Sequence, residues 1–113
     1  MAKISYVAAD PESYKDTVVG DGQCVAFVKA AAGAPVTSQW AEGIKVKGNS
    51  VKTGTAIATF QDGKYQKDTG GESHAAIYVS QDANGLLVCD QWSGHPVQQR
   101  TITSAPAFLG FCQ

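Results

Sequence analysis

The sequence predicts an α+β fold in which N-terminal helices pack on a mostly antiparallel sheet. Two helical patterns occur before Gly33, whereas short runs of branched and aromatic residues, separated by turn residues, occur from Val51 onward. Helices followed by strands, without regular alternation, are typical of this class. The chain has 113 residues, which is the length of one domain. We therefore expect residues 1–113 to form a single domain.

The composition is that of a globular protein and excludes several classes of function. Apolar residues make up 43% of the chain, charged residues make up 17%, and the formal net charge is −1. The nine Lys and Arg residues are scattered, and the loose cluster of Lys45, Lys47 and Lys52 is too sparse for a nucleic-acid interface. No apolar run approaches the roughly 18 residues of a membrane span. We therefore expect no nucleic-acid partner and no membrane span.

The cysteine and histidine pattern gives no indication of a metal or another cofactor. Three cysteines and two histidines are spread along the chain, without a Cys-x-x-Cys pair or a His-rich cluster. The first residues, Met-Ala-Lys-Ile-Ser-Tyr, lack the apolar core of a secretory signal. We therefore expect a protein made in the cytoplasm, which stays there or leaves by a route that needs no cleaved signal.

Two helices are predicted near the N-terminus. The first opens at Asp10-Pro11-Glu12, which supplies a cap, a proline at the first helical position and an early acid, and it extends to Thr17. The second has Asp21 as its cap and Gly22-Gln23 in its first turn, and it ends at Gly33. Its apolar face is formed by residues at helical spacing, namely Cys24, Phe27, Val28 and Ala31.

Cys24 lies in the first turn of the second helix. Unpaired backbone N–H groups and the positive end of the helix dipole favour a thiolate there, and the thiolate is the reactive nucleophile. The alternative is a buried core cysteine on the apolar face, which is common for cysteines outside disulfides. The helix alone favours the buried cysteine, so the choice between the two interpretations depends on the rest of the sequence.

The middle of the chain predicts a long connection followed by strands. The segment from Ala34 to Ser50 has little periodicity and is predicted to lie on the surface. It carries Trp40, which either packs in the core or forms a wall of a cleft. A turn and a strand follow at Val51–Phe60, a turn or hairpin at Gln61–Tyr65, and a polar loop at Lys67–Ser73.

The clearest part of the predicted sheet is a hairpin. His74–Val79 is rich in small, branched and aromatic residues, Ala83-Asn84-Gly85 is typical of a turn, and Leu86–Trp92 is the antiparallel partner. Val97–Thr103 alternates and predicts a further strand. Ala105–Phe111 is predicted to close the chain as an edge strand.

His74 is the candidate base for a nucleophilic Cys24. A cysteine that attacks an amide needs a base that takes its proton and later protonates the leaving amine, and a third group that orients the base. His74 opens its strand directly after a Gly-rich loop, so its ring can stand at the rim of the sheet beside the helix start. The alternative is an ordinary histidine at a strand end.

Asp90 is the first candidate for the orienting group, and Gln91 is the second. If residues 81–85 form the hairpin loop, His74 faces Trp92 across the two strands. Asp90 is then the diagonal neighbour of His74 on the same face, within reach of long side chains. A register shift of one residue would bring Gln91 to that face instead. The alternative for Asp90 is an acid at the sheet rim without a catalytic role.

Gln23 is the candidate oxyanion donor because it directly precedes Cys24. Its side-chain amide and the backbone N–H of Cys24 can both donate to a developing oxyanion. The alternative is a solvent-facing residue at a helix start. Trp40 and Trp92 are the candidates for lining a substrate cleft.

The remaining cysteine and histidine residues are given structural interpretations. Cys89 alternates away from Asp90, so it points into the core or toward Cys112. Whether Cys89 and Cys112 pair, leaving Cys24 unpaired, is left open by the sequence. His95 precedes a proline and is interpreted as a loop residue.

Three stretches resemble those of a known family. DGQCVAFVK resembles the helix start, GQC followed by an aromatic residue, of CHAP domains, the cysteine, histidine-dependent amidohydrolases and peptidases. TAIATF resembles the strand that follows the cysteine helix in that family, and SHAAIYVSQDANGLLVCDQW resembles its histidine hairpin. Trp40 falls where such domains often carry a tryptophan. The resemblance implies a papain-like fold of the CHAP and NlpC kind.

The small size and the hairpin sequence look closest to the type VI secretion amidase effectors, which are bacterial toxins that cut peptidoglycan peptides in the periplasm of a rival cell. This resemblance implies Cys24 as nucleophile, His74 as base and Asp90 as orienting residue. It also implies export into the target cell and a cognate immunity protein that plugs the cleft in the producing cell.

We therefore expect a cysteine amidase or endopeptidase that acts on peptidoglycan by way of an acyl-enzyme, without a cofactor. Two other interpretations stay open. One is a different thiol enzyme, such as a general peptidase or a lipid acyltransferase, although known acyltransferase relatives tend to place His before Cys. The other is a non-enzymatic binding domain in which Cys24 is buried and inert.

Overall fold

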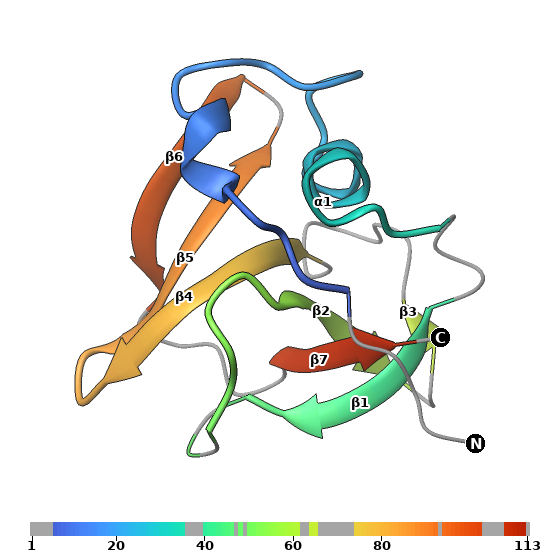
Figure 1. Ribbon diagram of the computed structural model, residues 1–113, viewed down its shortest axis with the longest axis vertical. Coiled ribbons are helices and arrows are strands. Elements are labelled where there is room, and N and C mark those ends of the chain that lie inside the picture. The colour runs from blue at the N-terminus through green and yellow to red at the C-terminus, as the bar shows by residue number, and fades with distance from the viewer. Residues whose placement is uncertain are drawn as a thin grey trace.

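The computed structural model describes residues 6–35, 40–46, 48, 50–61, 64–65, 74–92, 94–102 and 108–112. The helices in these ranges are the 3₁₀ helix η1 (Pro11–Tyr14) and α1 (Cys24–Ala32) (Figure 1). The strands are β1 (Ala41–Lys45), β2 (Ala56–Gln61), β3 (Lys64–Tyr65), β4 (Ala75–Asp82), β5 (Gly85–Trp92), β6 (His95–Ile102) and β7 (Phe108–Cys112). The predicted polar loop at residues 67–73 lies outside the described residues.

The described strands form one antiparallel sheet. Their order is β1-β7-β2-β4-β5-β6, and β3 pairs with the end of β2. The helix α1 packs against β4 and β5 (Figure 1). The α+β class and the antiparallel sheet predicted from the sequence are therefore confirmed.

The first predicted helix is shorter than expected. It is a four-residue 3₁₀ helix rather than a helix that reaches Thr17. The chain turns away at Asp16, which has a φ of 68°, because the backbone then pairs with the outer edge of β6. The Asp16 N–H donates to the Val97 carbonyl over 2.8 Å, and the Val97 N–H donates to the Thr17 carbonyl over 2.9 Å.

The helix α1 begins at Cys24, later than predicted. Gln23 is its N-cap and has an extended backbone. Asp21 does not cap the helix, because its Oδ1 accepts the Gln23 N–H over 3.0 Å and closes a turn just before the helix starts. Gly33 ends the helix with a φ of 69°, as its position predicts. Cys24 is therefore the first residue of the helix.

Side chains from alternate positions of the central strands form two apolar clusters. The predicted apolar face of α1 belongs to the first cluster, in which Phe27 and Val28 are fully buried against Ile77 and Cys89. The second cluster is built from Val46, which follows β1, and from residues on the intervening strand positions, namely Ile57, Ala76, Tyr78, Leu86 and Val88. The period of two along each strand thus places α1 on one side of β4 and β5.

Two predictions about the outer part of the sheet are wrong. The segment predicted as a surface connection contains β1, a five-residue strand that pairs with β7. The C-terminal strand β7 is consequently an inner strand, between β1 and β2, rather than an edge strand. The sequence of β1, AEGIK, combines a glycine with two charged residues and lacks the alternating apolar pattern of a strand.

The β4–β5 hairpin keeps the predicted register at the end that carries His74. Ile77 lies opposite Cys89, as it must if His74 is to face Trp92. A register shift between Tyr78 and Ser80 changes the pairing only nearer the turn, where Asp82 lies opposite Gly85. The irregularity thus leaves the predicted neighbourhood of His74 unchanged.

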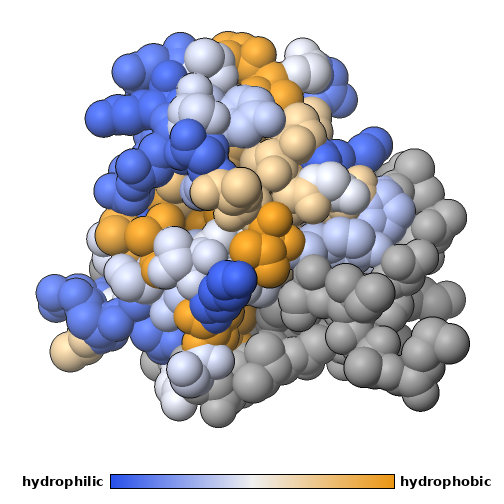
Figure 2. Space-filling view, viewed as in Figure 1, coloured by the Kyte–Doolittle hydropathy of each residue, from blue (hydrophilic) through white to orange (hydrophobic). Residues whose placement is uncertain are grey.

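The outer strand β6 lies under a hydrophilic surface. In Figure 2 hydrophilic side chains gather over the part of the molecule where Figure 1 places η1 and β6. Backbone pairing with residues 16–17 satisfies part of this edge, and polar cover protects edge strands from pairing with other chains. The buried face of β6 is represented by Val97, which is 1% exposed.

Candidate active site

Cys24 lies at the N-terminal end of α1 and is half-buried beside the first apolar cluster. Its position as first helical residue brings the sulfur near backbone N–H groups that have no acceptor within the helix. The Cys24 thiol is also hydrogen-bonded to the imidazole of His74. The structure thus brings together two side chains that are far apart in the sequence.

His74 directly precedes β4 and is fixed to β2 through its backbone. Its N–H donates to the Thr59 Oγ1 over 3.1 Å, and its carbonyl accepts the Thr59 N–H over 3.0 Å. The ring is 19% exposed, so it is reachable from solvent but mostly covered. These contacts hold the imidazole at the sheet rim beside the start of α1.

Asp90, on β5, lies against the ring of His74. Its Oδ2 is 2.6 Å from His74 Nε2, and its side chain is fully buried. This is the diagonal contact across the β4–β5 hairpin that the sequence predicts. Since a carboxylate can only accept, Nε2 is the ring nitrogen that donates to Asp90.

Arg100, on β6, also contacts Asp90 and was not among the predicted site residues. We call Cys24, His74, Asp90 and Arg100 the polar cluster. Its Nε donates to Asp90 Oδ1 over 3.0 Å and to Oδ2 over 2.9 Å, and one terminal nitrogen lies 2.7 Å from Oδ2. Val88 lies opposite Arg100 and two positions before Asp90, so Arg100 and Asp90 are diagonal neighbours across β5 and β6. The sequence does not indicate this pairing, because the register shifts between Asp90 and Trp92. Asp90 therefore lies between the candidate base His74, which directly precedes β4, and a cation on β6.

The charges in this cluster shift the pKa values of both His74 and Asp90. Burial lowers the pKa of His74, but the hydrogen bonds with Asp90 and Cys24 outweigh burial and raise the pKa to about 9. Burial raises the pKa of Asp90, but the hydrogen bonds from His74 and Arg100 outweigh it and lower the pKa below its usual value. An ionised Asp90 beside a protonated His74 is therefore the stable arrangement near neutral pH.

Gln91 does not take the place of Asp90. It is fully buried, and its Oε1 accepts the Val19 N–H over 2.9 Å. Its Nε2 donates to the Val19 and Gln23 carbonyls, each over 2.8 Å. The alternative of Gln91 as the group that orients His74 is therefore not supported, because its amide is fully used in fixing the segment before Cys24.

Gln23 and the two tryptophans occupy different environments. The Gln23 side chain is exposed and makes no hydrogen bond with the described residues, so it is available to a ligand. Trp40 is 4% exposed in the first apolar cluster, and its Nε1 donates to the Pro35 carbonyl over 2.8 Å. Of the two alternatives for Trp40, the structure supports core packing over a cleft wall.

Trp92, by contrast, is half-buried beside the polar cluster. The guanidinium carbon of Arg100 lies 4.4 Å from the centroid of its ring. The ring of His95 lies 4.3 Å from it, at an interplanar angle of 31°. His95 is exposed and is the first residue of β6 rather than a loop residue.

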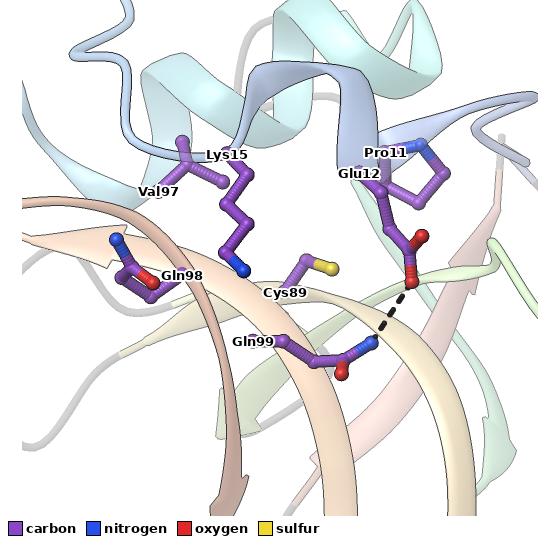
Figure 3. A pocket seen from close by; sticks show the side chains of 7 residues that line it. All are labelled: Pro11, Glu12, Lys15, Cys89, Val97, Gln98 and Gln99. Carbon is purple, nitrogen blue, oxygen red and sulfur yellow. Dashed lines mark hydrogen bonds between the residues drawn. The ribbon is translucent and has the colours of Figure 1, made fainter.

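Cys89 is a free thiol, 2% exposed, in the first apolar cluster. Of the two predicted directions for its side chain, the structure shows the core. Burial, followed by the negative charges of Glu12 and Asp90, raises its pKa to about 11. It borders a cavity of about 370 Å³ that excludes Cys24 and His74 (Figure 3). The cavity is lined by Pro11, Glu12, Lys15, Cys89, Val97, Gln98 and Gln99.

The described residues contain no group of three or more His, Cys, Asp or Glu side chains arranged to hold a metal ion. None of the helices in the described ranges has the length and apolar character needed to cross a membrane.

The fold is that of an amidase effector of known structure. The structure of type 6 secretion amidase effector 2 matches with a TM-score of 0.85 and 30% sequence identity, over 94% of this chain and 93% of that one. The type VI secretion amidase effector 2 protein of Salmonella typhi is 38% identical over 90 residues, 77% of this chain and 67% of that protein. The fold and these similarities place the chain in the class of amidase effectors.

The particular family follows from two further comparisons. The domesticated amidase effector 2 of Ixodes scapularis is 40% identical over 99 residues, 78% of this chain and 66% of that protein. The chain thus spans about two thirds of the length of both curated relatives. A family model described as domesticated amidase effector 2 matches residues 1–107. The chain belongs to the domesticated amidase effector 2 family.

Proposed function

We propose that this protein is a peptidoglycan amidase or endopeptidase that works through Cys24, His74 and Asp90. The observation that carries the proposal is the His74 imidazole, which contacts the Cys24 thiol and the Asp90 carboxylate at once. A nucleophile, a base and an orienting group in hydrogen-bond contact are the arrangement that acyl transfer requires. The names of the relatives, amidase effectors, support the same class of reaction.

The contacts of His74 assign a role to each of its ring nitrogens. Nε2 donates to Asp90, so Nδ1 is the nitrogen left to receive the Cys24 proton. Transfer of this proton gives a thiolate and an imidazolium, and the helix start and the imidazolium both stabilise the thiolate. Asp90 holds the ring in this tautomer and stabilises its positive charge.

The proposed reaction has two stages. The Cys24 thiolate attacks the amide carbonyl, and the imidazolium gives its proton to the amine nitrogen as the carbon–nitrogen bond breaks, which leaves a thioester. Water then attacks the thioester while His74 takes a proton from it, and the carboxylic acid and the thiol are released. In this proposal the Cys24 backbone N–H, at the helix start, and the exposed Gln23 amide stabilise the oxyanion of both tetrahedral intermediates.

A papain-like fold is part of this proposal. A cysteine at the start of a helix that packs on an antiparallel sheet, with histidine and aspartate on adjoining strands, supports that assignment. Trp92, half-buried beside Arg100, is the aromatic residue we propose for the substrate cleft. Peptide stems or crosslinks of peptidoglycan are the proposed substrate, and delivery to a target-cell periplasm with a cognate immunity protein in the producing cell is the proposed setting.

Digestion of purified peptidoglycan peptides, followed by mass spectrometry, tests the proposal. We expect the protein to release products with a new amine and a new carboxyl group, and Cys24→Ala to reduce the rate by at least about 10³-fold. Cys89→Ala is the matched control, because it removes a thiol that lies outside the cluster, and it should keep its activity if it folds. Undiminished cleavage by Cys24→Ala would exclude the mechanism.

The same experiment separates the alternatives. Cleavage of casein peptides but not peptidoglycan peptides would indicate a general peptidase, and acyl exchange on phospholipid vesicles would indicate an acyltransferase. No turnover of any of these substrates, together with a slowly reacting Cys24, would indicate a binding domain.

A further inference from the structure

We infer that Arg100 is a positioning residue, held in place by Trp92, which fixes the Asp90 carboxylate against His74. The inference rests on the proposed function and adds a residue that the predicted site does not contain. It concerns the cation on β6 that contacts both carboxylate oxygens of Asp90. Arg100 acts through Asp90 and need not touch the substrate.

The first argument is the number and direction of the contacts to Asp90. Arg100 donates through two different nitrogens, and Oδ2 is shared with His74 Nε2. A guanidinium presents its donors in a rigid planar fork, so two-point binding fixes the plane of the carboxylate as well as its position. The oxygen that faces His74 thus has a defined direction rather than one set by a single hydrogen bond.

The second argument is burial. The Asp90 side chain is fully buried, and its partner on the β4 side is the partly exposed imidazole of His74. A buried carboxylate without sufficient compensation becomes protonated instead of staying charged. A neutral Asp90 would stabilise the His74 imidazolium far less. Arg100 supplies a permanent positive charge at 2.7 Å, which keeps the carboxylate ionised when His74 is neutral during the reaction cycle.

The third argument is the support that Arg100 itself receives. Its side chain is 39% exposed, and an arginine with that freedom ordinarily samples several rotamers. Here its guanidinium carbon lies 4.4 Å from the centroid of the Trp92 ring, a distance at which cation–π attraction is effective. Trp92 follows Asp90 by two positions on β5, so one strand holds both the carboxylate and the aromatic surface that steadies its cation.

The positive charge of Arg100 also affects the pKa of His74. Three titratable or charged groups contact the ring among the described residues: Cys24 from α1, Asp90 from β5 and Arg100 from β6. The first two favour the imidazolium. A terminal nitrogen of Arg100 lies 3.5 Å from Nε2, and a positive charge so close disfavours a second positive charge on the ring. Removing the guanidinium should therefore raise the pKa of His74 and also raise that of Asp90.

The test compares Arg100→Gln and Arg100→Lys with Gln99→Ala, an exposed control on the same strand. We expect Arg100→Gln to lower kcat by about 10- to 100-fold with little change in KM, because positioning acts on the base and not on substrate binding. Both limbs of its pH–rate profile should move to higher pH. Arg100→Lys should return the limbs toward their original positions but recover only part of kcat, because it restores the charge without the fork.

A readout that needs no turnover distinguishes failure of this inference from failure of the proposed function. The His74 ring nitrogens are titrated by NMR in the Cys24→Ser background, with and without Arg100→Gln, and in Trp92→Leu should Arg100→Gln not fold. An upward shift of the His74 pKa in Arg100→Gln, or doubled and broadened ring resonances in Trp92→Leu, supports the positioning role. An unmoved titration with sharp, single resonances overturns it, even in a protein that cleaves peptidoglycan.

Discussion

Asp90 and Gln91 are neighbours on β5, yet their side chains hold opposite halves of the candidate site. Asp90 contacts the ring of His74, which directly precedes β4, and the guanidinium of Arg100 on β6. Gln91 binds the backbone of Val19 and Gln23, which lead into Cys24. Because successive residues of a strand point to opposite faces, one dipeptide can fix both the His74 ring and the start of the helix that carries Cys24. The distance between Cys24 and His74 therefore depends on β5.

The contacts of Gln91 predict that Gln91→Glu is strongly destabilising. The substitution keeps the shape of the side chain but replaces an amide that donates to two carbonyls by a carboxylate that repels them. We expect a loss of about 3 kcal/mol in the free energy of unfolding at pH 8, measured by urea denaturation. The loss should be smaller at pH 5, because a protonated glutamate can donate one of the lost hydrogen bonds. This hydrogen bond is lost as the pH rises and the glutamate ionises.

Gln23→Glu is the matched control for that substitution. It has the same chemistry at an exposed side chain that makes no hydrogen bond with the described residues, and it places an acid at a helix N-cap. We expect its stability to change by less than about 0.5 kcal/mol. Equal effects of the two substitutions would show that the Gln91 contacts do not hold the helix start.

The parts of the site that the sequence predicted depend on local rules. The helix face was readable because Phe27 and Val28 follow the helical period, and Gly33 ended it. The contact between His74 and Asp90 followed from hairpin pairing alone, since the register shift near the turn leaves that end of the hairpin unchanged. Short sequence separation and a strict period of two were sufficient for these features.

The parts that were missed depend on contacts between distant segments. The strand β1 forms because β7 offers it a partner, and the sequence of β1 alone does not predict a strand. The first helix stops early because residues 16–17 pair with β6, a partner far along the chain. Arg100 was missed because the β5–β6 register shifts between Asp90 and Trp92 and because β6 begins at His95, which the sequence indicates as a loop residue.

The environment of His74 predicts a pH–rate profile with a high alkaline limit. In the proposed mechanism the ring must be protonated to give a proton to the leaving amine, and its pKa of about 9 means that it keeps this proton through neutral pH. We expect kcat to fall above pH 9 as the imidazolium is lost. Amidase assays between pH 5 and pH 10.5 would measure the pH at which kcat falls to half, and NMR titration of the His74 ring would measure its pKa.

Substitution of either partner should lower that pKa, because Cys24 and Asp90 both stabilise the imidazolium. In Cys24→Ser and in Asp90→Asn we therefore expect the pKa of His74 to be lower than in the native protein. Burial of the ring also lowers this pKa. Asp90→Asn should also reduce kcat by about 10²-fold or more, since the ring loses its orienting charge. A His74 titration that is the same in all three proteins would contradict the proposed contacts.

The different environments of Cys24 and Cys89 predict selective alkylation in the folded protein. Cys24 is half-buried at a helix start and is hydrogen-bonded to the His74 imidazole. Cys89, by contrast, is 2% exposed and has a pKa of about 11. At pH 7.5 iodoacetamide should modify Cys24 at least about 10-fold faster than Cys89, because the thiolate is the reacting form and it must be reached by the reagent. Peptide mass spectrometry after a time course measures each site separately, and 8 M urea provides the control, since unfolding should bring the two rates together. Equal rates in the folded protein would mean that the Cys24 sulfur is neither activated nor accessible, and the reaction proposed for this site could not begin.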